Sequence, residues 1–225
     1  MQRRLTLFDL DHTLLDGDSD VLWVEFLMDQ GVLDREAFEA RNRRMEHDYR
    51  AGTVSAHEFC EFYVATLAGR SREGWLALRS SYFESSIVPR IGKAALALVA
   101  KHRDAGDLIA LTTATNRFLT ELTAPFLGIE HLIATECEIG ADSSFTGRIA
   151  GTLNMREGKV KRLHDWLAMQ GLALHDVDSS LYSDSINDLP LFEAVQHAVA
   201  VDPDRRIAEL ARARGWPIMS LREAA

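Results

Sequence analysis

The hydrophobic and polar positions of the chain change their spacing twice. Residues Leu5–Phe8 form a short apolar run that ends in acidic residues, which is typical of a buried parallel strand. Residues 18–84 instead have the wider spacing of amphipathic helices. From Pro89 onwards, short apolar runs alternate with helical stretches. This alternation predicts an α/β fold with a parallel sheet covered on both faces, and the helical stretch is then an insertion after the first strand.

The inserted stretch predicts four helices and no strand. The first helix surrounds residues 21–26, and the second covers about residues 34–49. Ser55 and Glu58 have the spacing of a capping box, which places the start of the third helix there. Ser71 is a suitable N-cap for the fourth.

The remainder of the chain predicts the core of the fold. The expected elements are a helix at 91–105, a strand at 108–111, a short helix up to 125, a strand at 132–134, a hairpin at 138–149, a helix at 159–169, a strand at 180–182, a helix at 189–194, a strand at 198–201, a helix at 205–214 and an edge strand at 218–219.

The composition narrows the class of protein. A chain of 225 residues suits one large domain, or a core with a modest insertion, and 47% hydrophobic residues are enough for a sizeable core. The net charge of −9 disfavours nucleic acid and anionic membranes as partners. It also means that a phosphate site in this chain needs local cations. Nothing in the sequence indicates an obligate protein partner.

The cysteines and the missing targeting signals predict a cytoplasmic location. Cys60 and Cys137 lie far apart without a metal-binding spacing, so we interpret them as reduced thiols. The apolar run near the start is too short for a signal sequence, and no stretch reaches the roughly 18 apolar residues of a membrane span.

Polar residues follow several of the predicted strands. Doubly wound sheets bind ligands at the carboxyl ends of their strands, so these residues are candidates for a site. Together with the lysine at the start of the helix at 159–169, they form a coherent phosphoryl-transfer site. They are Asp9, Asp11, Thr112, Thr113, Lys159, Asp184 and Asp188.

The first two acids suggest covalent catalysis. Asp9 and Asp11 are two positions apart at a strand end, so their side chains can point the same way. One carboxylate can attack phosphorus and form an acyl phosphate, which splits one displacement into two easier steps. The second carboxyl can protonate the leaving oxygen and later deprotonate the attacking water.

Such a site requires cations. Two unit charges about 4 Å apart cost about 4 kcal/mol at an effective dielectric constant near 20, so a carboxylate is repelled by a phosphate. Mg²⁺ fits because it prefers oxygen ligands, and Asp9 and Asp184 are the natural ligands. Lys159 supplies a fixed positive charge. Asp188 follows Asp184 closely enough to orient this lysine or to bind a metal-bound water.

The groups that contact the phosphate are less well defined. The Thr113 hydroxyl and the backbone N–H of Ala114 can donate to phosphate oxygens. Other residues of the same segments could take the roles of Thr113 and Lys159. These competing residues are Thr112, Thr115 and Lys161.

Four segments resemble the motifs of the haloacid dehalogenase-like hydrolase superfamily, and the match is closest to its phosphoserine phosphatase-like branch. They are FDLDHTLLDGDS, ALTTATN, EGKVKRL and YSDSINDLPLF. The pair DxDHT and SDSxND, each after a strand, is far more specific than a lone threonine or lysine. The resemblance covers the whole chain. It implies a Rossmann-like doubly wound core of residues 1–15 and 88–225, and a helical C1-type cap of residues 16–87.

The resemblance also implies a role for each matched residue. Asp9 is expected to be the nucleophile that carries an aspartyl phosphate, and Asp11 the acid and base. Mg²⁺ is expected to bind the side chains of Asp9 and Asp184 and the backbone carbonyl of Asp11. The other matched positions are the phosphate-binding Thr113 and Lys159, the last acidic residue Asp188 and its neighbour Asn187.

A departure from the pattern of phosphoserine phosphatases places phosphoserine second among the candidate substrates. In phosphoserine phosphatases a cap glutamate recognises the substrate's amino group and a cap arginine its carboxylate. Asp18 falls near the glutamate position, but Tyr63 stands at the arginine position, and residues 52–67 contain no arginine or lysine. Arg117 could replace the missing arginine from the core side. The candidates for substrate contact are Asp18, Trp23, Tyr63, Asn116 and Arg117.

The segment after the first motif is acidic, with Asp16, Asp18, Asp20 and Glu25. We therefore expect a small phosphate monoester with a cationic organic part and no carboxylate, such as the amino-alcohol phosphate histidinol phosphate. A neutral sugar or polyol phosphate is an alternative. We expect the helical cap to leave limited room, which argues against a phosphoprotein or a nucleic acid as substrate.

Several residues near the motifs have simpler interpretations. His12 is expected to pack or to point away from the site. Trp23 and Phe26 fit the core of the helical stretch better than a substrate cage, and the run RNRRMEHDYR fits a solvated helix face. The paired acids of the two motifs could also be an acidic strand end and a helix cap.

Two other classes of protein remain open. A catalytically weak binding or regulatory module could use the same fold, but it would not need both Asp9 and Asp11. A dehalogenase needs no metal, and Asp11, Asp184 and Asp188 would then have no purpose. Turnover of p-nitrophenyl phosphate with and without Mg²⁺ separates both classes from a phosphatase.

Overall fold

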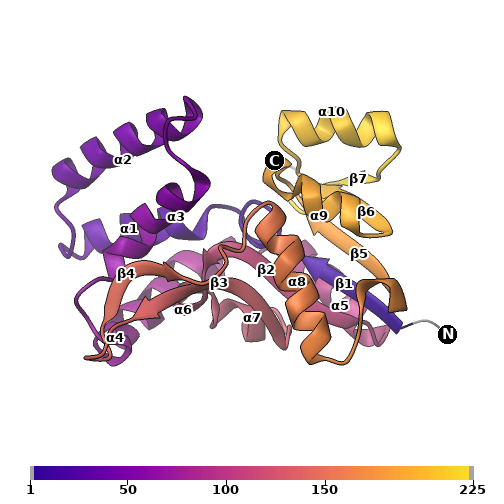
Figure 1. Cartoon of the computed structure of the whole chain (residues 1–225), viewed down its shortest axis with the longest axis horizontal. Helices are drawn as coiled ribbons and strands as arrows, with labels where there is room; N and C mark the ends of the chain where they lie inside the picture. The colour runs from indigo at the N-terminus through magenta and orange to yellow at the C-terminus, as the bar shows by residue number, and fades with distance from the viewer. Residues whose placement is uncertain (1–2, 223–225) are drawn as a thin grey trace.

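The computed structural model describes residues 3–222, and these contain a seven-stranded sheet with the order β4-β3-β2-β1-β5-β6-β7 (Figure 1). Neighbouring strands are parallel except for β3 and β4, which are antiparallel. The predicted α/β fold with a doubly wound, Rossmann-like sheet is therefore confirmed. The strands are β1 (Arg3–Phe8), β2 (Leu108–Asn116), β3 (His131–Ile139), β4 (Phe145–Ala150), β5 (Val177–Ser183), β6 (His197–Val201) and β7 (Ile218–Met219).

Helices cover both faces of this sheet. In Figure 1, α8 lies over the near face, and α5 lies behind the strands. The core helices are α5 (Lys93–Asp104), α6 (Arg117–Thr120), α7 (Thr123–Phe126), α8 (Glu157–Met169), α9 (Leu189–Ala194) and α10 (Arg205–Arg214). Within the described residues, no helix has both the length and the apolar character needed to cross a membrane.

The central strand β1 shows why its sequence is an almost unbroken apolar run. Leu5 and Leu7 are fully buried in the cluster formed with α8, α9 and α10. Phe8 is fully buried in the other large cluster, which includes Val99 of α5. Because both faces of the strand are covered, most of its side chains are apolar, and the buried Thr6 donates its hydroxyl to Asp107.

The inserted stretch forms the four predicted helices, α1 (Ser19–Asp29), α2 (Arg35–Arg50), α3 (Ala56–Val64) and α4 (Arg72–Tyr82). Three short helical turns, η1 (Ala65–Leu67), η2 (Phe83–Ile87) and η3 (Val88–Arg90), complete it. The capping box of Ser55 and Glu58 is present, and the Ser71 hydroxyl accepts from the N–H of Gly74 at 3.2 Å. These local signals explain why the helix starts could be predicted.

The interior of this stretch is aromatic. Trp23 is fully buried, and its ring centroid lies 5.6 Å from that of Trp75 and 5.1 Å from that of Tyr82. Phe26 is also buried. Both residues therefore belong to the core of the helical stretch, as the sequence indicated.

The helical stretch contacts the hairpin edge of the sheet. Helix α3 packs on β4, where the Glu61 carboxylate accepts from the backbone N–H of Ile149 at 3.1 Å. Cys60 and Val64 bury their side chains against Ile149. The division into a core and a cap at residues 15/16 and 87/88 stays a prediction, and the outermost predicted core residues, 1–2 and 223–225, lie outside the described range.

Two strands extend further than the sequence indicated. Strand β2 continues to Asn116, so Thr112 and Thr113 lie inside the strand and not after it, and the register with β3 shifts between Thr113 and Asn116. Strand β3 continues into the predicted hairpin with β4. In the turn of this hairpin, the Gly140 N–H donates to the Ser144 carbonyl at 2.8 Å, as expected for a hairpin.

Candidate functional site

The order of the strands creates a crevice between β1 and β5. From β1 the sheet grows through β2 and β3 on one side and through β5 and β6 on the other. At such a switch point, ligands bind at the carboxyl ends of the strands. Asp9 directly follows β1, and Asp184 directly follows β5.

A cavity of about 230 Å³ opens at this point. Its wall combines residues from the strand ends, the start of α8 and the helical stretch. They are Asp9, Asp11, His12, Asp18, Asp20, Tyr49, Phe59, Cys60, Ala114, Thr115, Met155, Lys159, Asp184, Ser185, Asn187 and Asp188.

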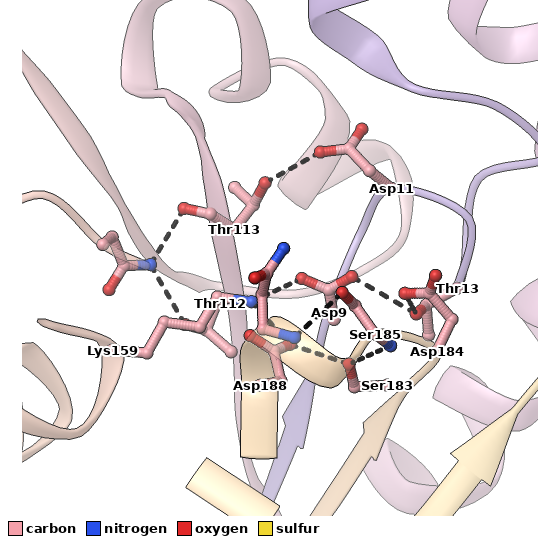
Figure 2. Close-up of polar contacts among 12 residues, drawn as sticks. Asp9, Asp11, Thr13, Thr112, Thr113, Lys159, Ser183, Asp184, Ser185 and Asp188 are labelled. Carbon is pink, nitrogen blue, oxygen red and sulfur yellow. Dashed lines mark hydrogen bonds and ion pairs between the residues drawn. The ribbon is translucent and has the colours of Figure 1, made fainter. Parts of the chain in front are cut away.

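Lys159 joins two of the acids (Figure 2). Its Nζ lies 2.7 Å from Asp9 Oδ1 and 2.7 Å from Asp188 Oδ2. Burial alone would lower the lysine's pKa, but the charges of Asp188 and Asp9 outweigh it, so the pKa is raised. The Ser183 hydroxyl also donates to Asp188 Oδ2, at 2.7 Å. Lys159 is therefore a fixed ammonium group that holds the Asp9 carboxylate in place.

The start of α8 brings this lysine close to the strand ends. Gly158 packs so tightly on the backbone carbonyl of Leu153 that a Cβ there would overlap it. Only glycine allows this approach. The EGK segment therefore needs its glycine for packing, and the lysine that follows points into the cavity.

Thr13 connects the acids of the two motifs. Its hydroxyl lies 3.2 Å from Asp9 Oδ2 and 3.1 Å from Asp184 Oδ1 (Figure 2). Burial raises the pKa of Asp9 well above its usual value, with Asp188, Asp184 and Asp11 adding to the effect and Lys159 opposing it. Burial and then the charge of Asp188 raise the pKa of Asp184 to about 6. The strand ends therefore bring together more acidic groups than one lysine can neutralise.

Asp11 is held from three directions. The backbone N–H of Ser19 donates to its Oδ1 at 2.7 Å. The hydroxyls of Thr113 and Thr115 donate to its Oδ2 at 3.2 and 2.9 Å. Its carboxyl is thus fixed, and the residue lines the same cavity as Asp9.

The structure distinguishes the three candidate threonines. The Thr112 hydroxyl accepts from the Asn154 amide at 3.1 Å and does not line the cavity. The Thr113 hydroxyl is turned to Asp11. Ala114 and Thr115 both line the cavity. Which of these groups contacts a phosphate stays a prediction.

Four substrate-contact candidates do not line the cavity, and each forms hydrogen bonds within the fold. Trp23 Nε1 donates to the Thr66 hydroxyl at 3.0 Å, and the Tyr63 hydroxyl donates to Asn42 Oδ1 at 3.0 Å. The other two serve core elements: Asn116 caps α6, and Arg117 Nε lies 2.9 Å from a carboxylate oxygen of Glu136. Asp18 is the candidate of this group that reaches the cavity.

Other expectations also need correction. His12 lines the cavity, although the sequence suggested that it points away. Of the acidic segment, Asp18 and Asp20 reach the cavity, whereas Asp16 and Glu25 are exposed elsewhere. Tyr49 comes from the run interpreted as a solvated face, yet it also lines the cavity.

The sequence analysis missed some residues of the site. Thr13 was available in the DxDHT motif, where a hydroxyl two positions after Asp11 could have been assigned to the carboxylates. Phe59 of α3 and Met155 of the loop before α8 have no such marker, since only the tertiary fold brings them to the cavity. Nor does Asn154, which is fully buried and whose amide bonds β2 and β3 together.

The donor set suits a magnesium ion better than a transition metal. In the part of the chain that the structure describes, no three His, Cys, Asp or Glu side chains are grouped as metal ligands. Mg²⁺ needs only one or two carboxylates and keeps several waters. Asp9 and Asp184 share the hydroxyl of Thr13, so two carboxylates converge there. These residues fit a magnesium ion, and the Asp11 carbonyl is the third expected ligand.

Comparisons with known proteins agree with the motifs. The chain belongs to the haloacid dehalogenase-like hydrolase family, whose model matches residues 6–193. It is 36% identical to a histidinol-phosphatase of Neisseria meningitidis serogroup C (strain 8013), over 98% of this chain and 100% of that protein. It is 33% identical to phosphoserine phosphatase SerB1 of Mycobacterium tuberculosis (strain ATCC 25618 / H37Rv), over 96% of this chain and 70% of that protein.

Solved structures share the fold. A Bordetella pertussis Tohama I protein of unknown function superposes with a TM-score of 0.92 and 44% identity, over 97% of this chain and 99% of the other. A phosphoserine phosphatase solved as a phospho-aspartyl intermediate analogue has a TM-score of 0.69 and 16% identity, over 99% of this chain and 95% of the other. The resemblance inferred from the four motifs is confirmed.

Proposed function

We propose that this hydrolase is a magnesium-dependent phosphomonoesterase that acts on a small phosphorylated metabolite through an aspartyl phosphate on Asp9. The observation that carries the proposal is the position of Asp9. One carboxylate oxygen contacts Lys159 and the other contacts Thr13, at the switch point of the sheet and on the wall of a cavity. The histidinol-phosphatase and phosphoserine phosphatase relatives support the same reaction class.

In the first half-reaction, a carboxylate oxygen of Asp9 attacks phosphorus. The bond from phosphorus to the ester oxygen breaks, and the protonated Asp11 gives its proton to the leaving alkoxide. The hydrogen bonds to Asp11 from Ser19, Thr113 and Thr115 keep its carboxyl beside the leaving group. The product alcohol then leaves, and the phosphoryl group stays on Asp9.

In the second half-reaction, Asp11 takes a proton from water as the water oxygen attacks phosphorus. The bond between phosphorus and Asp9 breaks, which releases inorganic phosphate and restores both carboxyl groups. Lys159 keeps Asp9 in position throughout, because its ammonium group also contacts Asp188.

The side chains of Asp9 and Asp184 and the carbonyl of Asp11 would hold Mg²⁺. The ion would supply positive charge for the phosphate oxygens next to an acidic wall. Six carboxyl groups and one lysine line the cavity, so the wall carries excess negative charge. A cation is therefore needed before a phosphate dianion can bind.

For the substrate, we propose an amino-alcohol phosphate such as histidinol phosphate, with phosphoserine second. Among the described residues, the cavity wall contains no arginine, and its lysine is already bonded to two carboxylates. A substrate carboxylate would therefore lie beside acids without a cationic partner. The relative named histidinol-phosphatase matches along its whole length, which supports the same order of preference.

Steady-state kinetics on a panel of phosphate monoesters tests this function. We expect turnover of histidinol phosphate that requires Mg²⁺ and is lost in Asp9→Asn. Phosphoserine as the best substrate would overturn the substrate assignment. Turnover of p-nitrophenyl phosphate no greater than in Asp9→Asn would indicate a binding module, and metal-free halide release would indicate a dehalogenase. The cytoplasmic location, and the absence of nucleic-acid, membrane and obligate protein partners, stay predictions.

A further inference from the structure

The half of the cavity that faces the helical stretch has no task in phosphoryl transfer. Asp18 and Asp20 lie there, together with Tyr49, Phe59 and Cys60 from α2 and α3. Acids and aromatic rings in one small space combine hydrogen-bonding groups with surfaces that exclude water. Such a combination suits the organic part of a ligand.

Asp20 carries an unsatisfied acceptor. Its Oδ2 lies 3.3 Å from the Thr115 hydroxyl, which is closer to Asp11, and its Oδ1 is enclosed and has no hydrogen-bond partner. A buried acceptor without a partner is costly, so such atoms are rare in folded proteins. Within the described residues, neither Asp20 nor Asp18 forms an ion pair with a lysine or arginine. The carboxyl group of Asp20 therefore lines the cavity without a cationic partner among the described residues.

The aromatic part of the wall is held firmly. The rings of Tyr49 and Phe59 are stacked, with centroids 4.4 Å apart and 21° between their planes. Arg156, at the start of α8, donates to the Tyr49 hydroxyl at 2.9 Å and to Asn187 Oδ1 at 3.2 Å. These contacts join α2 to the core beside the cavity, so the aromatic pair is preorganised.

We propose that Asp20 and the Tyr49–Phe59 pair determine specificity, and that they select a phosphate monoester whose organic part carries both a cationic amine and a flat ring. The carboxyl group of Asp20 accepts an N–H of the amine, and the aromatic pair packs against the ring. The proposal rests on the proposed phosphatase function. It adds which residues recognise the organic part and which two chemical features they select.

Four esters separate the two features. Histidinol phosphate has both the amine and a ring, and ethyl phosphate has neither. Ethanolamine phosphate has only the amine, and phenyl phosphate has only a ring. The amine preference is the ratio of kcat/KM for ethanolamine phosphate to that for ethyl phosphate. The ring preference is the corresponding ratio for phenyl phosphate to ethyl phosphate. Comparing variants with the wild type cancels the differences in leaving group.

Asp20→Asn and Phe59→Leu are expected to affect different ratios. Asp20→Asn should lower the amine preference by about tenfold or more, because a hydrogen bond to a charged group is lost. Phe59→Leu should lower the ring preference by about three- to tenfold and leave the amine preference near that of the wild type. Glu25→Gln is the matched control, since it makes the same kind of change on the exposed side of α1 and should alter neither ratio.

The outcomes separate this proposal from the phosphatase function. Equal loss of kcat/KM for all four esters in Asp20→Asn would overturn it, because Asp20 would then serve the fold or the chemistry. Wild-type turnover without an amine preference would overturn it and leave the phosphatase function intact. No turnover of any ester would overturn both.

Product inhibition of the wild type tests the proposal without a variant. Histidinol should compete with histidinol phosphate, whereas a neutral alcohol of similar size should not. Equal inhibition by both alcohols would overturn the proposal, even if a variant failed to fold.

Discussion

Two buried carboxylates depend on the ammonium group of Lys159. The lysine side chain is only 3% exposed and lies 2.7 Å from both Asp9 and Asp188. Lys161, two residues further along α8, is exposed, and its Nζ lies 2.7 Å from a carboxylate oxygen of Asp165. The two lysines were competing candidates in the sequence, and their surroundings now differ completely.

We expect Lys159→Met to lower the free energy of unfolding by about 3 to 5 kcal/mol, because the charges of Asp9 and Asp188 would be left buried and unpaired. Phosphatase activity should fall at least a hundredfold. Lys161→Met should change the free energy of unfolding by less than about 0.5 kcal/mol. Urea denaturation of the three proteins, with kinetics on the folded fraction, measures both effects, and similar results for the two variants would contradict the role of Lys159.

Asp18 couples stability to pH. Burial and then the charge of Asp11 raise the pKa of its carboxyl to about 6. In the unfolded chain an aspartate titrates near about pH 4. Between these values the folded protein holds a proton that the unfolded chain has released, so stability falls as the pH rises from about 4 to 6.

Asp18→Asn should weaken this fall and stabilise the metal-free protein at pH 7 by on the order of 1 to 2 kcal/mol. The asparagine can still cap α1, where Asp18 accepts from the backbone N–H of Asp20 and Val21. Asp34→Asn is the control, since Asp34 caps α2 in an exposed position. Thermal unfolding across pH 4 to 7 checks the prediction, which fails if the two variants respond alike.

Among the elements, those marked by local signals could be predicted from the sequence. Ser55 with Glu58 defines the start of α3, and Ser71 that of α4, because a cap needs only residues three positions away. The end of β2 depends instead on distant partners. The strand continues past Thr113 because β3 pairs with it and the Asn154 amide bonds the carbonyls of Thr113 and Ile133. No local pattern encodes that contact.

The start of α8 also contains a strained residue. Arg156 has φ 53° and ψ −128°, a conformation that glycine adopts far more readily than other residues. Its guanidinium group contacts Tyr49 of α2 and Asn187 of the core. We infer that these contacts offset the backbone strain and hold the aromatic wall of the cavity.

Substituting Arg156 separates the two effects. Arg156→Ala and Arg156→Gly both lose the contacts, so both should raise KM for histidinol phosphate. Only Arg156→Gly also relieves the backbone, so it should be more stable than Arg156→Ala by about 1 kcal/mol or more. Denaturation of the two variants measures this difference directly. A glycine variant less stable than the alanine variant would show that the backbone is not strained.

For the whole molecule, the sequence predicted the sheet and the convergence of the motif residues better than the shape of the cavity. Asp9 and Asp184 follow strands, so their meeting depends only on strand order, which the alternation of elements indicates. Tyr49 and Phe59 reach the cavity because α2 and α3 fold back on the core, and their spacing within each helix does not reveal this. Tyr63 is the opposite case. The sequence suggested that it contacts the substrate, but its hydroxyl donates to Asn42 and the residue does not line the cavity.

The excess of acids at the centre of the molecule predicts that a divalent cation stabilises the whole fold. Asp9 and Asp184 both have raised pKa values, chiefly because they are buried, and the one lysine of the wall does not neutralise six carboxyl groups. An ion that binds the folded protein at a hundred times its dissociation constant adds about 2.7 kcal/mol to the free energy of unfolding.

Adding Mg²⁺ at pH 7 should therefore raise the melting temperature, and chelation should reverse the rise. The rise should be much smaller in Asp184→Asn than in the control Asp178→Asn. Asp178 lies at the opposite end of β5, where its carboxylate contacts His197. Sodium chloride at matched ionic strength should not reproduce it, and an equal rise in both variants would place the ion elsewhere.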